Sequence, residues 1–160
     1  AVNQTIFTAP HAEYCYAYDD KWWIEYGEEV KKLKCNRVTC SIKAHTLGAE
    51  RVPKASGKFD GSFAIGSSSG AHAICLAVML GATKVILLGF DCQHTEGKRH
   101  HHEDYPNGFG NADRPERWIK EHEKIAQGAK NLGVRIINCT RHTALECYEK
   151  QALSEALNGC

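Results

Sequence analysis

GSSSGAHAICLAVMLGATKVILLGFD, residues 66–91, is the stretch that decides the fold class. It joins a turn of small residues to a helical pattern and then to a short apolar run that ends in an acid. An apolar stripe with helical period follows the turn, at Ala71, Ile74, Cys75, Val78 and Met79. Gly81 ends this predicted helix, and the apolar run at 85–88 is typical of a buried strand in a parallel sheet. The stretch therefore predicts half of an α/β unit.

The turn before this helix has two interpretations. Its residues carry no bulky side chains, so their N–H groups and hydroxyls can approach a phosphate at the helix N-terminus. They are Gly66, Ser67, Ser68, Ser69 and Gly70. Such a turn is also a common helix N-cap that binds nothing, and it matches neither the Gly-x-Gly-x-x-Gly fingerprint nor a Walker loop. We predict a nucleotide-binding turn at Ser67, Ser68, Ser69 and Gly70, with simple capping as the alternative.

Length and composition are those of one globular domain. The chain has 160 residues, 42% hydrophobic and 24% charged, with a formal net charge of +1. This charge gives no general attraction to nucleic acid or to an anionic membrane, so neither is a predicted partner. No apolar run reaches the ~20 residues that span a bilayer, and no signal-peptide pattern opens the sequence. We therefore expect a cytoplasmic protein.

The eight cysteines would suggest disulfides in a small secreted protein. Several of them, among them Cys75, Cys139 and Cys147, fall in apolar periodic segments, which favours buried reduced thiols. No Cys-x-x-Cys pair suggests a structural zinc.

The rest of the chain alternates predicted strands and helices. Strands are expected at 14–18, 37–41, 62–65 and 134–137, helices at 20–34, 114–132 and 145–157, and loops at 1–7 and 45–60. Trp22 and Trp23 are expected to pack between a helix and a sheet rather than to stack on a base. Thr140 or Thr143 is the expected cap of the last helix. This order predicts an α/β fold, a Rossmann-like three-layer sandwich with a mostly parallel sheet.

The chain opens on Ala1, Val2 and Asn3, as if inside a strand. We therefore expect a single Rossmann-like domain at 1–160 that lacks its N-terminal strand and turn. Asn3 would end that first strand with its amide exposed.

The carboxyl edge of the predicted sheet is the expected ligand site, because ligands of open α/β sheets bind there. Asp91 ends the strand at 85–88, and Arg141 and His142 follow the strand at 134–137. These residues should reach the same edge as the serine turn.

A histidine-rich segment follows Asp91 and contains His94, His100 and His102. Imidazole titrates near neutrality, so one of these histidines is the candidate general base, with Asp91 beside it. Imidazole and carboxylate groups also bind metals, but the spacing matches no zinc pattern, and we predict no metal site. A solvated loop without function is the remaining interpretation.

Residues 70–84, 85–91 and 94–98 resemble a group of uncharacterised proteins of tailed bacteriophages. These are similar to the Rossmann-like superfamily of archaeal-type 6-hydroxymethyl-dihydropterin diphosphokinases and Campylobacter-type bacterial sialyltransferases. In the sialyltransferases a serine–glycine turn and a strand-end asparagine hold the CMP donor, which implies such roles for Ser69, Gly70 and Asn3. Their Gly-x-Asp strand end is similar to residues 89–91, and their catalytic histidine lies in the region of 94–122.

The resemblance and the residues together predict a nucleotide- or sugar-nucleotide-dependent transferase, glycosyl or diphosphokinase-like, with a loop histidine as base. Mg²⁺ is the cofactor that this hypothesis leaves open, and a homo-oligomer is left open too. A phage-encoded chain would act in the host cytoplasm. The alternative is a non-catalytic nucleotide-binding protein, or a phage structural or host-interaction protein that keeps the fold alone.

Overall fold

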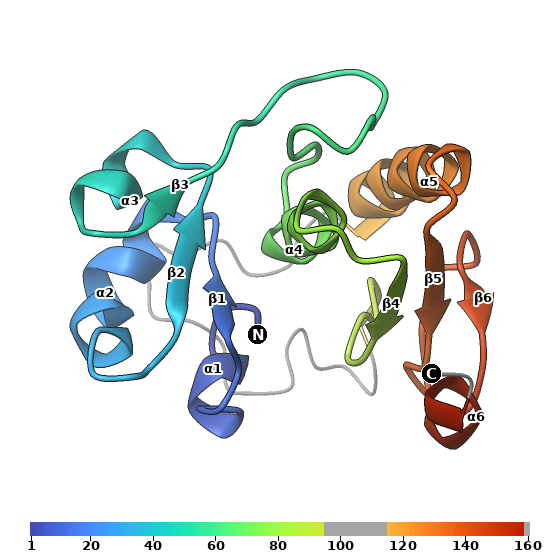
Figure 1. The fold of residues 1–160 in the computed structure, drawn as a ribbon, viewed down its shortest axis with the longest axis horizontal. Coiled ribbons are helices and arrows are strands. Elements are labelled where there is room, and N and C mark those ends of the chain that lie inside the picture. Colours follow the sequence, from blue (N-terminus) through green and yellow to red (C-terminus); the bar gives the residue numbers. More distant parts are fainter. Residues whose placement is uncertain (95–114, 159–160) are drawn as a thin grey trace.

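Two small parallel sheets form the framework of the mixed α/β structure (Figure 1). The computed structural model describes residues 1–94 and 115–158. The first sheet has the order β1 (Tyr14–Tyr16), β2 (Asn36–Thr39), β3 (Glu50–Arg51), and the second has the order β4 (Lys84–Leu87), β5 (Arg135–Asn138), β6 (Glu149–Lys150). Every strand pair within these sheets is parallel, as the alternation of strands and helices predicted.

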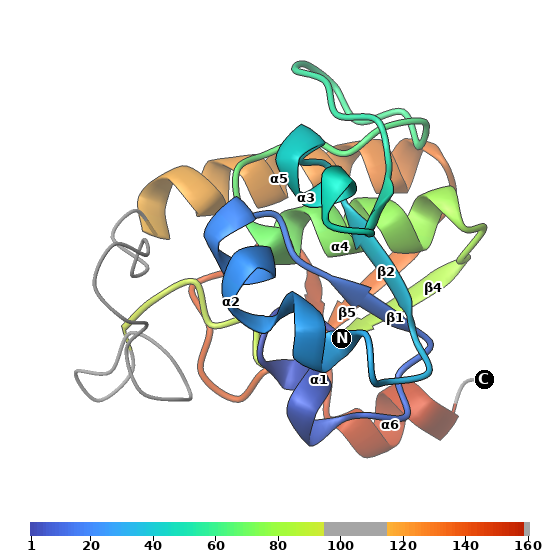
Figure 2. The same ribbon diagram turned by 90° about the vertical axis from the view of Figure 1, so that its left-hand side faces the viewer.

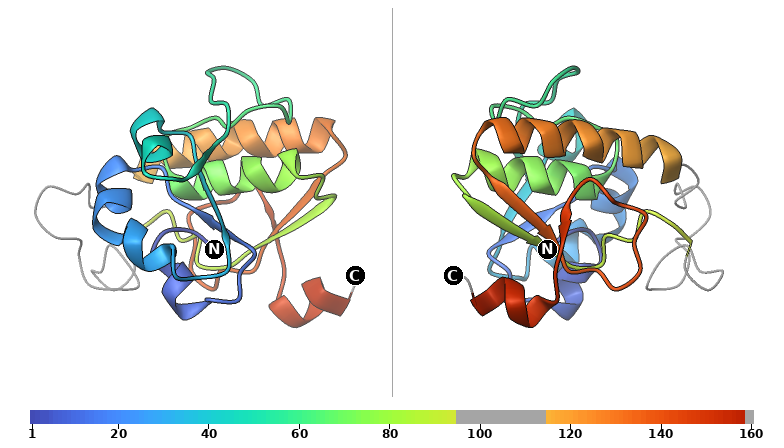
Figure 3. Two further views of the ribbon diagram at one scale, coloured as in Figure 1. Left: turned by 60° about the vertical axis from the view of Figure 1, so that its left-hand side comes forward. Right: turned by 90° about the vertical axis from the view of Figure 1, so that its right-hand side faces the viewer.

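Helices cover the two sheets from opposite sides. They are α1 (Thr5–Thr8), α2 (Asp20–Val30), α3 (Ile42–Thr46), α4 (Ser69–Met79), α5 (Pro115–Asn131) and α6 (Leu153–Asn158). Helices α4 and α5 lie side by side on one side of the strands, and α1 and α6 lie on the other (Figures 2 and 3). Among residues 1–94 and 115–158, no helix is both long and apolar enough to cross a membrane.

Helix α4 forms where the sequence predicted it. The Ser68 hydroxyl caps its start by accepting a hydrogen bond from the Ala71 N–H at 3.2 Å. The helix ends at Met79, and Gly81 two residues later has a φ of 90°, a left-handed conformation that glycine adopts without strain. Ala71, Ile74 and Cys75 of the predicted stripe are buried.

Strands β4 and β5 confirm the predicted pair of parallel strands. Val85 lies opposite Ile136, and Leu87 lies opposite Asn138. Strand β4 ends at Leu87, one residue before the predicted end, and Leu88 is 57% exposed.

Two hydrophobic clusters fill the interior. The larger lies between α4, α5 and both sheets, and the smaller contains Trp22 and Trp23 of α2. Both tryptophans are buried, and Trp23 Nε1 donates to the Ala17 carbonyl at 2.9 Å. The expectation that they pack rather than stack on a base is thus confirmed.

The predicted helix at 145–157 is wrong. Residues 149–150 form β6, which pairs with β5, and only 153–158 are helical. Thr143 does not cap a helix: its hydroxyl donates to the Phe90 carbonyl at 2.6 Å and accepts from the Leu145 N–H. The amphipathic pattern there reflects burial of Leu145 and Tyr148 in the main core rather than helical period.

Three short predictions are also wrong in part. The expected loop at 45–60 contains the end of α3 and all of β3, and the expected loop at 1–7 contains most of α1. Residues 62–65 form no strand, and Ala64 makes a single bridge to Lys54. These elements are four or five residues long at most, too short for a periodic pattern to distinguish them from loop.

We predict that Gly128→Ala destabilises the fold by about 1–3 kcal/mol, as overpacking of a filled interior does. A Cβ at Gly128 in α5 would overlap the backbone oxygen of Phe59, which cannot move aside as the end of a side chain would. Gly27→Ala in α2 is the matched control, because its Cβ would lie no closer than 3.8 Å to any neighbour. Urea unfolding should show the first variant weakened and the second unchanged or stabilised; equal effects would contradict the tight contact.

Candidate functional site at the carboxyl edge of the sheets

The N-terminus of α4 is attached to the end of a strand in each sheet. Ser69 Oγ accepts the N–H of Tyr18, two residues beyond β1, at 3.0 Å. A Cβ built on Gly70 would lie 3.0 Å from the ring of Phe90, three residues beyond β4. The carboxyl ends of β1 and β4 therefore both lie near the same helix N-terminus. The prediction that the serine turn and Asp91 share one edge is confirmed.

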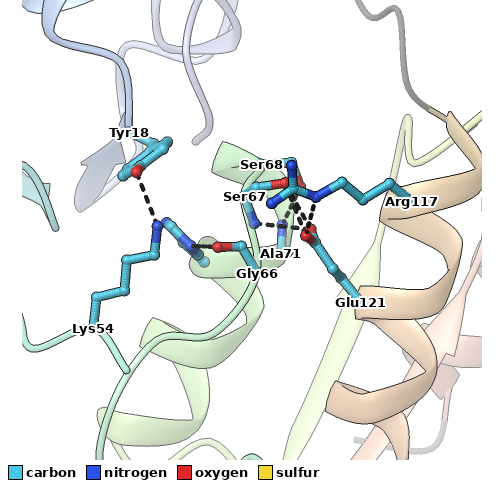
Figure 4. Close-up of polar contacts among 9 residues, drawn as sticks. Tyr18, Lys54, Gly66, Ser67, Ser68, Ala71, Arg117 and Glu121 are labelled. Carbon is cyan, nitrogen blue, oxygen red and sulfur yellow. Dashed lines mark hydrogen bonds and ion pairs between the residues drawn. The ribbon is translucent and has the colours of Figure 1, made fainter. Parts of the chain in front are cut away.

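The three serines of the turn each hold an internal contact, and Figure 4 shows those of Ser67 and Ser68. Ser68 is the N-cap and Ser69 binds Tyr18. Ser67 donates its N–H and its hydroxyl to the Glu121 carboxylate of α5, at 2.8 Å in each case. The capping interpretation of the turn is thus realised for Ser68, whereas nucleotide binding by the serines stays a prediction.

The Glu121 carboxylate brings a negative charge to the start of α4. Arg117 lies one turn earlier on α5 and its Nε donates to Glu121 Oε1 at 3.1 Å. The Glu121 side chain is 13% exposed, and the Arg117 side chain is 55% exposed. A carboxylate at a helix N-terminus is electrostatically favourable, so Glu121 stabilises the turn as a bound anion would.

Two donors of this helix start remain unused. The N–H groups of Ser69 and Gly70 have no acceptor among the residues that the structure describes. The N–H groups on either side of them are used, by Ser67 on Glu121 and by Ala71 on the Ser68 hydroxyl. The edge at Ser69 and Gly70 can therefore still donate hydrogen bonds to an anionic ligand.

The loop after β5 is joined to the loop after β4. The Phe90 N–H donates to Thr140 Oγ1 at 2.9 Å, and the Ala144 N–H donates to the Asp91 carbonyl at 2.8 Å. Arg141 and His142, which lie between these anchors, are exposed. The structure thus brings both residues to the edge at Asp91, as predicted, and their role as ligand contacts stays a prediction.

Asn3 lies between the two sheets at this edge. Val2 pairs in parallel with Tyr16, and the Asn3 N–H donates to the Tyr16 carbonyl at 3.0 Å, on the side of β1 away from β2 (Figure 1). Asn3 has a left-handed φ of 49°, which asparagine adopts more readily than other side chains. Its Oδ1 atom is buried and has no hydrogen-bond partner in the described part of the chain.

Cys92 is the other non-glycine residue with positive φ in the described ranges, at 46°. Cys92 lies five residues beyond β4, and Asn3 directly follows the bridge residue Val2, so both lie in segments that leave a paired strand. Backbone conformations of this kind cost free energy and concentrate at functional sites.

Lys54 and Tyr18 form a pair that no sequence pattern predicts (Figure 4). Lys54 Nζ donates to the Tyr18 hydroxyl at 2.9 Å and lies 4.2 Å from the centre of its ring. Because the Tyr18 N–H binds Ser69, this lysine places a positive charge near the serine turn.

His72 lies beneath the turn in a fully buried network. Its Nε2 is 3.0 Å from the Gly66 carbonyl, which can only accept, so Nε2 carries the proton and Nδ1 accepts. The Tyr16 hydroxyl lies 3.1 Å from Nδ1 and 2.8 Å from Cys40 Sγ. Burial lowers the pKa of His72 to about 4 and raises the pKa of the Cys40 thiol. The network therefore holds neutral groups that position the turn.

His122 of α5 is buried in a similar way. Its Nδ1 lies 2.9 Å from the Tyr148 hydroxyl, and its ring packs edge-on against Phe90. Burial lowers the pKa of His122 to about 4. A histidine that is neutral and enclosed at neutral pH supports the loop after β4 rather than acting as an exposed base.

The structure describes only one of the three predicted catalytic histidines. His94 is exposed beyond the end of β4, whereas His100 and His102 lie outside the described residues. Within residues 1–94 and 115–158, no group of His, Cys, Asp or Glu side chains is arranged to hold a metal ion. The described cysteines are free thiols: Cys75 is buried as expected, whereas Cys139 and Cys147 are only partly buried, and Cys160 lies outside the described range.

Sequence reasoning missed Glu121, Lys54 and the two buried histidine networks. Glu121 shares the buried face of α5 with His122 and Ile125, and an acid next to such a face is a weak signal of an internal anion. Nothing in the sequence near Lys54 indicates its position beside Tyr18.

The comparisons with known proteins add no relative. Neither a family model, nor a curated protein, nor a solved structure matches this chain.

We expect Glu121→Ala to destabilise the protein by about 1–3 kcal/mol, because the Ser67 N–H and hydroxyl lose their acceptor. Glu123→Ala is the matched control, since Glu123 is exposed on the same helix. Urea unfolding would measure both variants, and equal stability of the two would show that Glu121 does not hold the turn.

Acid should destabilise the fold through His72 and His122. Their folded pKa values are lowered to about 4, whereas imidazole in the unfolded chain titrates near ~6.5. The unfolded state thus binds more protons between these values, and the free energy of unfolding should fall as pH drops from about 6.5 to about 4. Each histidine contributes a slope of up to about 1.4 kcal/mol per pH unit. Urea unfolding at stepped pH checks this: His72→Gln and His122→Gln should flatten the profile, and an unchanged slope would contradict the assignment.

Proposed function

We propose that this chain is a nucleotide- or sugar-nucleotide-dependent transferase that binds its donor at the carboxyl edge, between Asn3 and the start of α4. The donor phosphate accepts the N–H groups of Ser69 and Gly70. The Asn3 amide contacts the nucleoside, and Arg141 and His142 border the donor on the β5 side. A histidine after Asp91, among His94, His100 and His102, takes the proton from the acceptor.

A Rossmann-like strand arrangement is part of this proposal. If Ala1–Asn3 is counted as a strand, the strands lie in the spatial order β3, β2, β1, Ala1–Asn3, β4, β5, β6 (Figure 1). The chain builds outward in one direction to β3 and then crosses through α4 to build outward the other way. This reversal defines a switch point, and in open α/β sheets ligands bind in the crevice at that point.

Asn3 is the observation that carries the proposal. It lies at the switch point with a left-handed backbone and a buried Oδ1 that lacks a partner among the described residues. Buried polar atoms are nearly always hydrogen-bonded, so an unpaired one at a predicted site calls for a partner. A nucleoside amino or hydroxyl group would supply it after a small rotation of the amide.

Two features favour the second candidate, a nucleotide-binding protein without turnover. The Glu121 carboxylate already places a negative charge at the turn, where it accepts the Ser67 N–H. The histidines beside the described edge, His72 and His122, are buried and have lowered pKa values. Catalysis under the first proposal therefore depends on the segment after Asp91. Donor hydrolysis with and without Mg²⁺ separates the two: turnover supports the transferase, and tight binding without turnover supports the second candidate.

Asn3→Gly should weaken nucleotide binding by about tenfold, because it removes one hydrogen bond of about 1.4 kcal/mol. Glycine keeps the left-handed backbone, so the change isolates the amide. Asn36→Gly is the matched control, since Asn36 is exposed at the start of β2, at the opposite edge. Calorimetry with CMP, ADP and GDP measures both variants. Equal affinity of Asn3→Gly and the unmodified chain would remove Asn3 from the site.

A further inference from the structure

A hollow of about 410 Å³ lies between helix α5 and the β5 and β6 side of the second sheet. Figure 1 shows these three elements next to one another. The hollow is half open to solvent, and its volume is within the range of small-molecule sites. Among the residues that the structure describes, none of those proposed to bind the donor lines it. It is therefore a second, separate place at which a small molecule could bind.

The lining of this hollow is mostly apolar. Val134 and Ile136 are two residues apart, so their side chains lie on one face of the sheet, and both pack with the main core. Ala126 adds a methyl group from α5. The Tyr148 ring lines the hollow too, but its hydroxyl is engaged with His122 Nδ1 at 2.9 Å. The lining therefore suits a hydrocarbon better than a polar body.

Two charged residues line the hollow, and only one of them is paired. Both carboxylate oxygens of Glu149 accept from the Arg135 guanidinium, at 2.8 Å and 2.9 Å, so its charge is matched. The Lys130 ammonium has no hydrogen-bond or ion-pair partner within residues 1–94 and 115–158. The hollow thus presents one unmatched positive charge beside an apolar floor, which is complementary to an anionic group.

Glu123 sets the direction in which such a ligand would lie. It precedes Lys130 by two turns of α5, which is about 10 Å along the helix. Burial, with a smaller contribution from the Glu123 carboxylate, raises the pKa of the Cys147 thiol to about 11. The thiol is therefore neutral at pH 7, and the Cys147 side of the hollow lies within reach of a negative charge. An anionic group is favoured near Lys130 and disfavoured near Cys147.

We propose that this hollow binds an aliphatic monocarboxylate, with the carboxylate at Lys130 and the hydrocarbon chain running past Ile136 toward Cys147. A single carboxylate matches the single unpaired lysine, whereas a second anionic group would approach Glu123. A nucleotide or a sugar fits less well, because the apolar floor offers few hydrogen-bond partners. The site shares no residue with the donor site, so it does not depend on the transferase proposal.

Octanoate is the probe that tests the site, and the Cys147 thiol is the reporter. The full chain is alkylated with N-ethylmaleimide at increasing octanoate concentrations, and each thiol is followed by peptide mass spectrometry. When nine parts in ten of the protein are bound, alkylation of Cys147 should slow by about tenfold, because only the empty form reacts. Alkylation of Cys35, which is half-buried beside the first sheet, should not change. The NMR methyl signals of Val134 and Ile136 should shift over the same concentration range.

Related ligands and variants separate the two parts of the interaction. Hexanoate should bind about tenfold more weakly, because two fewer methylene groups are buried. Lys130→Gln should weaken octanoate binding by about threefold to fivefold through loss of the charge pair. Lys124→Gln is the matched control and should bind normally, since Lys124 is exposed on α5 and does not share the face of Ala126. Both lysines are exposed, so neither change should disturb the fold.

Three results would overturn the proposal. The first is no slowing at Cys147, or equal slowing at Cys35, which would mean that octanoate acts on the whole protein. The second is an equal effect of the two lysine variants. The third is protection of Cys147 that needs no octanoate and grows with protein concentration as a dimer forms in light scattering, because a second copy would then cover the hollow.

Discussion

The N-terminus of α4 is the point on which the structure depends. The Ser69 hydroxyl accepts the N–H of Tyr18 from the segment after β1, and Gly70 leaves room for the ring of Phe90 from the segment after β4. From below, His72 holds the Gly66 carbonyl, and from α5 the Glu121 carboxylate holds Ser67. The carboxyl ends of β1 and β4 thus meet at one helix start, although the two sheets share no strand pairing among residues 1–94 and 115–158.

The sequence was sufficient to predict the elements that have a strong hydrophobic period. Helix α4 has a continuous apolar stripe and glycine boundaries, and β4 and β5 are apolar runs after helices, so their type, direction and adjacency could be predicted. The region after β5 could not. Leu145 and Tyr148 repeat at a spacing that suits a helix, but Thr143 diverts the backbone by binding Phe90, a contact between residues fifty-three positions apart. Interactions of that range leave no local pattern.

The sequence predicted the edge at which the candidate site lies, but it did not predict the contacts within the site. The rule that ligands gather at carboxyl ends correctly brought Asp91, Arg141 and the serine turn together. It could not show that the serine hydroxyls are used internally, because their partners, Tyr18 and Glu121, come from distant segments. The same limit applies to Asn3, whose buried amide oxygen becomes visible only when the fold encloses it. Side chains that look free in a sequence are often already engaged.

A crystal structure of the chain soaked with CMP, ADP or GDP tests the central claim most directly. We predict density for the nucleotide at the carboxyl edge, with its phosphate within hydrogen-bond distance of the Ser69 and Gly70 N–H groups and its nucleoside against the Asn3 amide. A nucleotide bound elsewhere, or an empty edge at a concentration that saturates binding in solution, would contradict it.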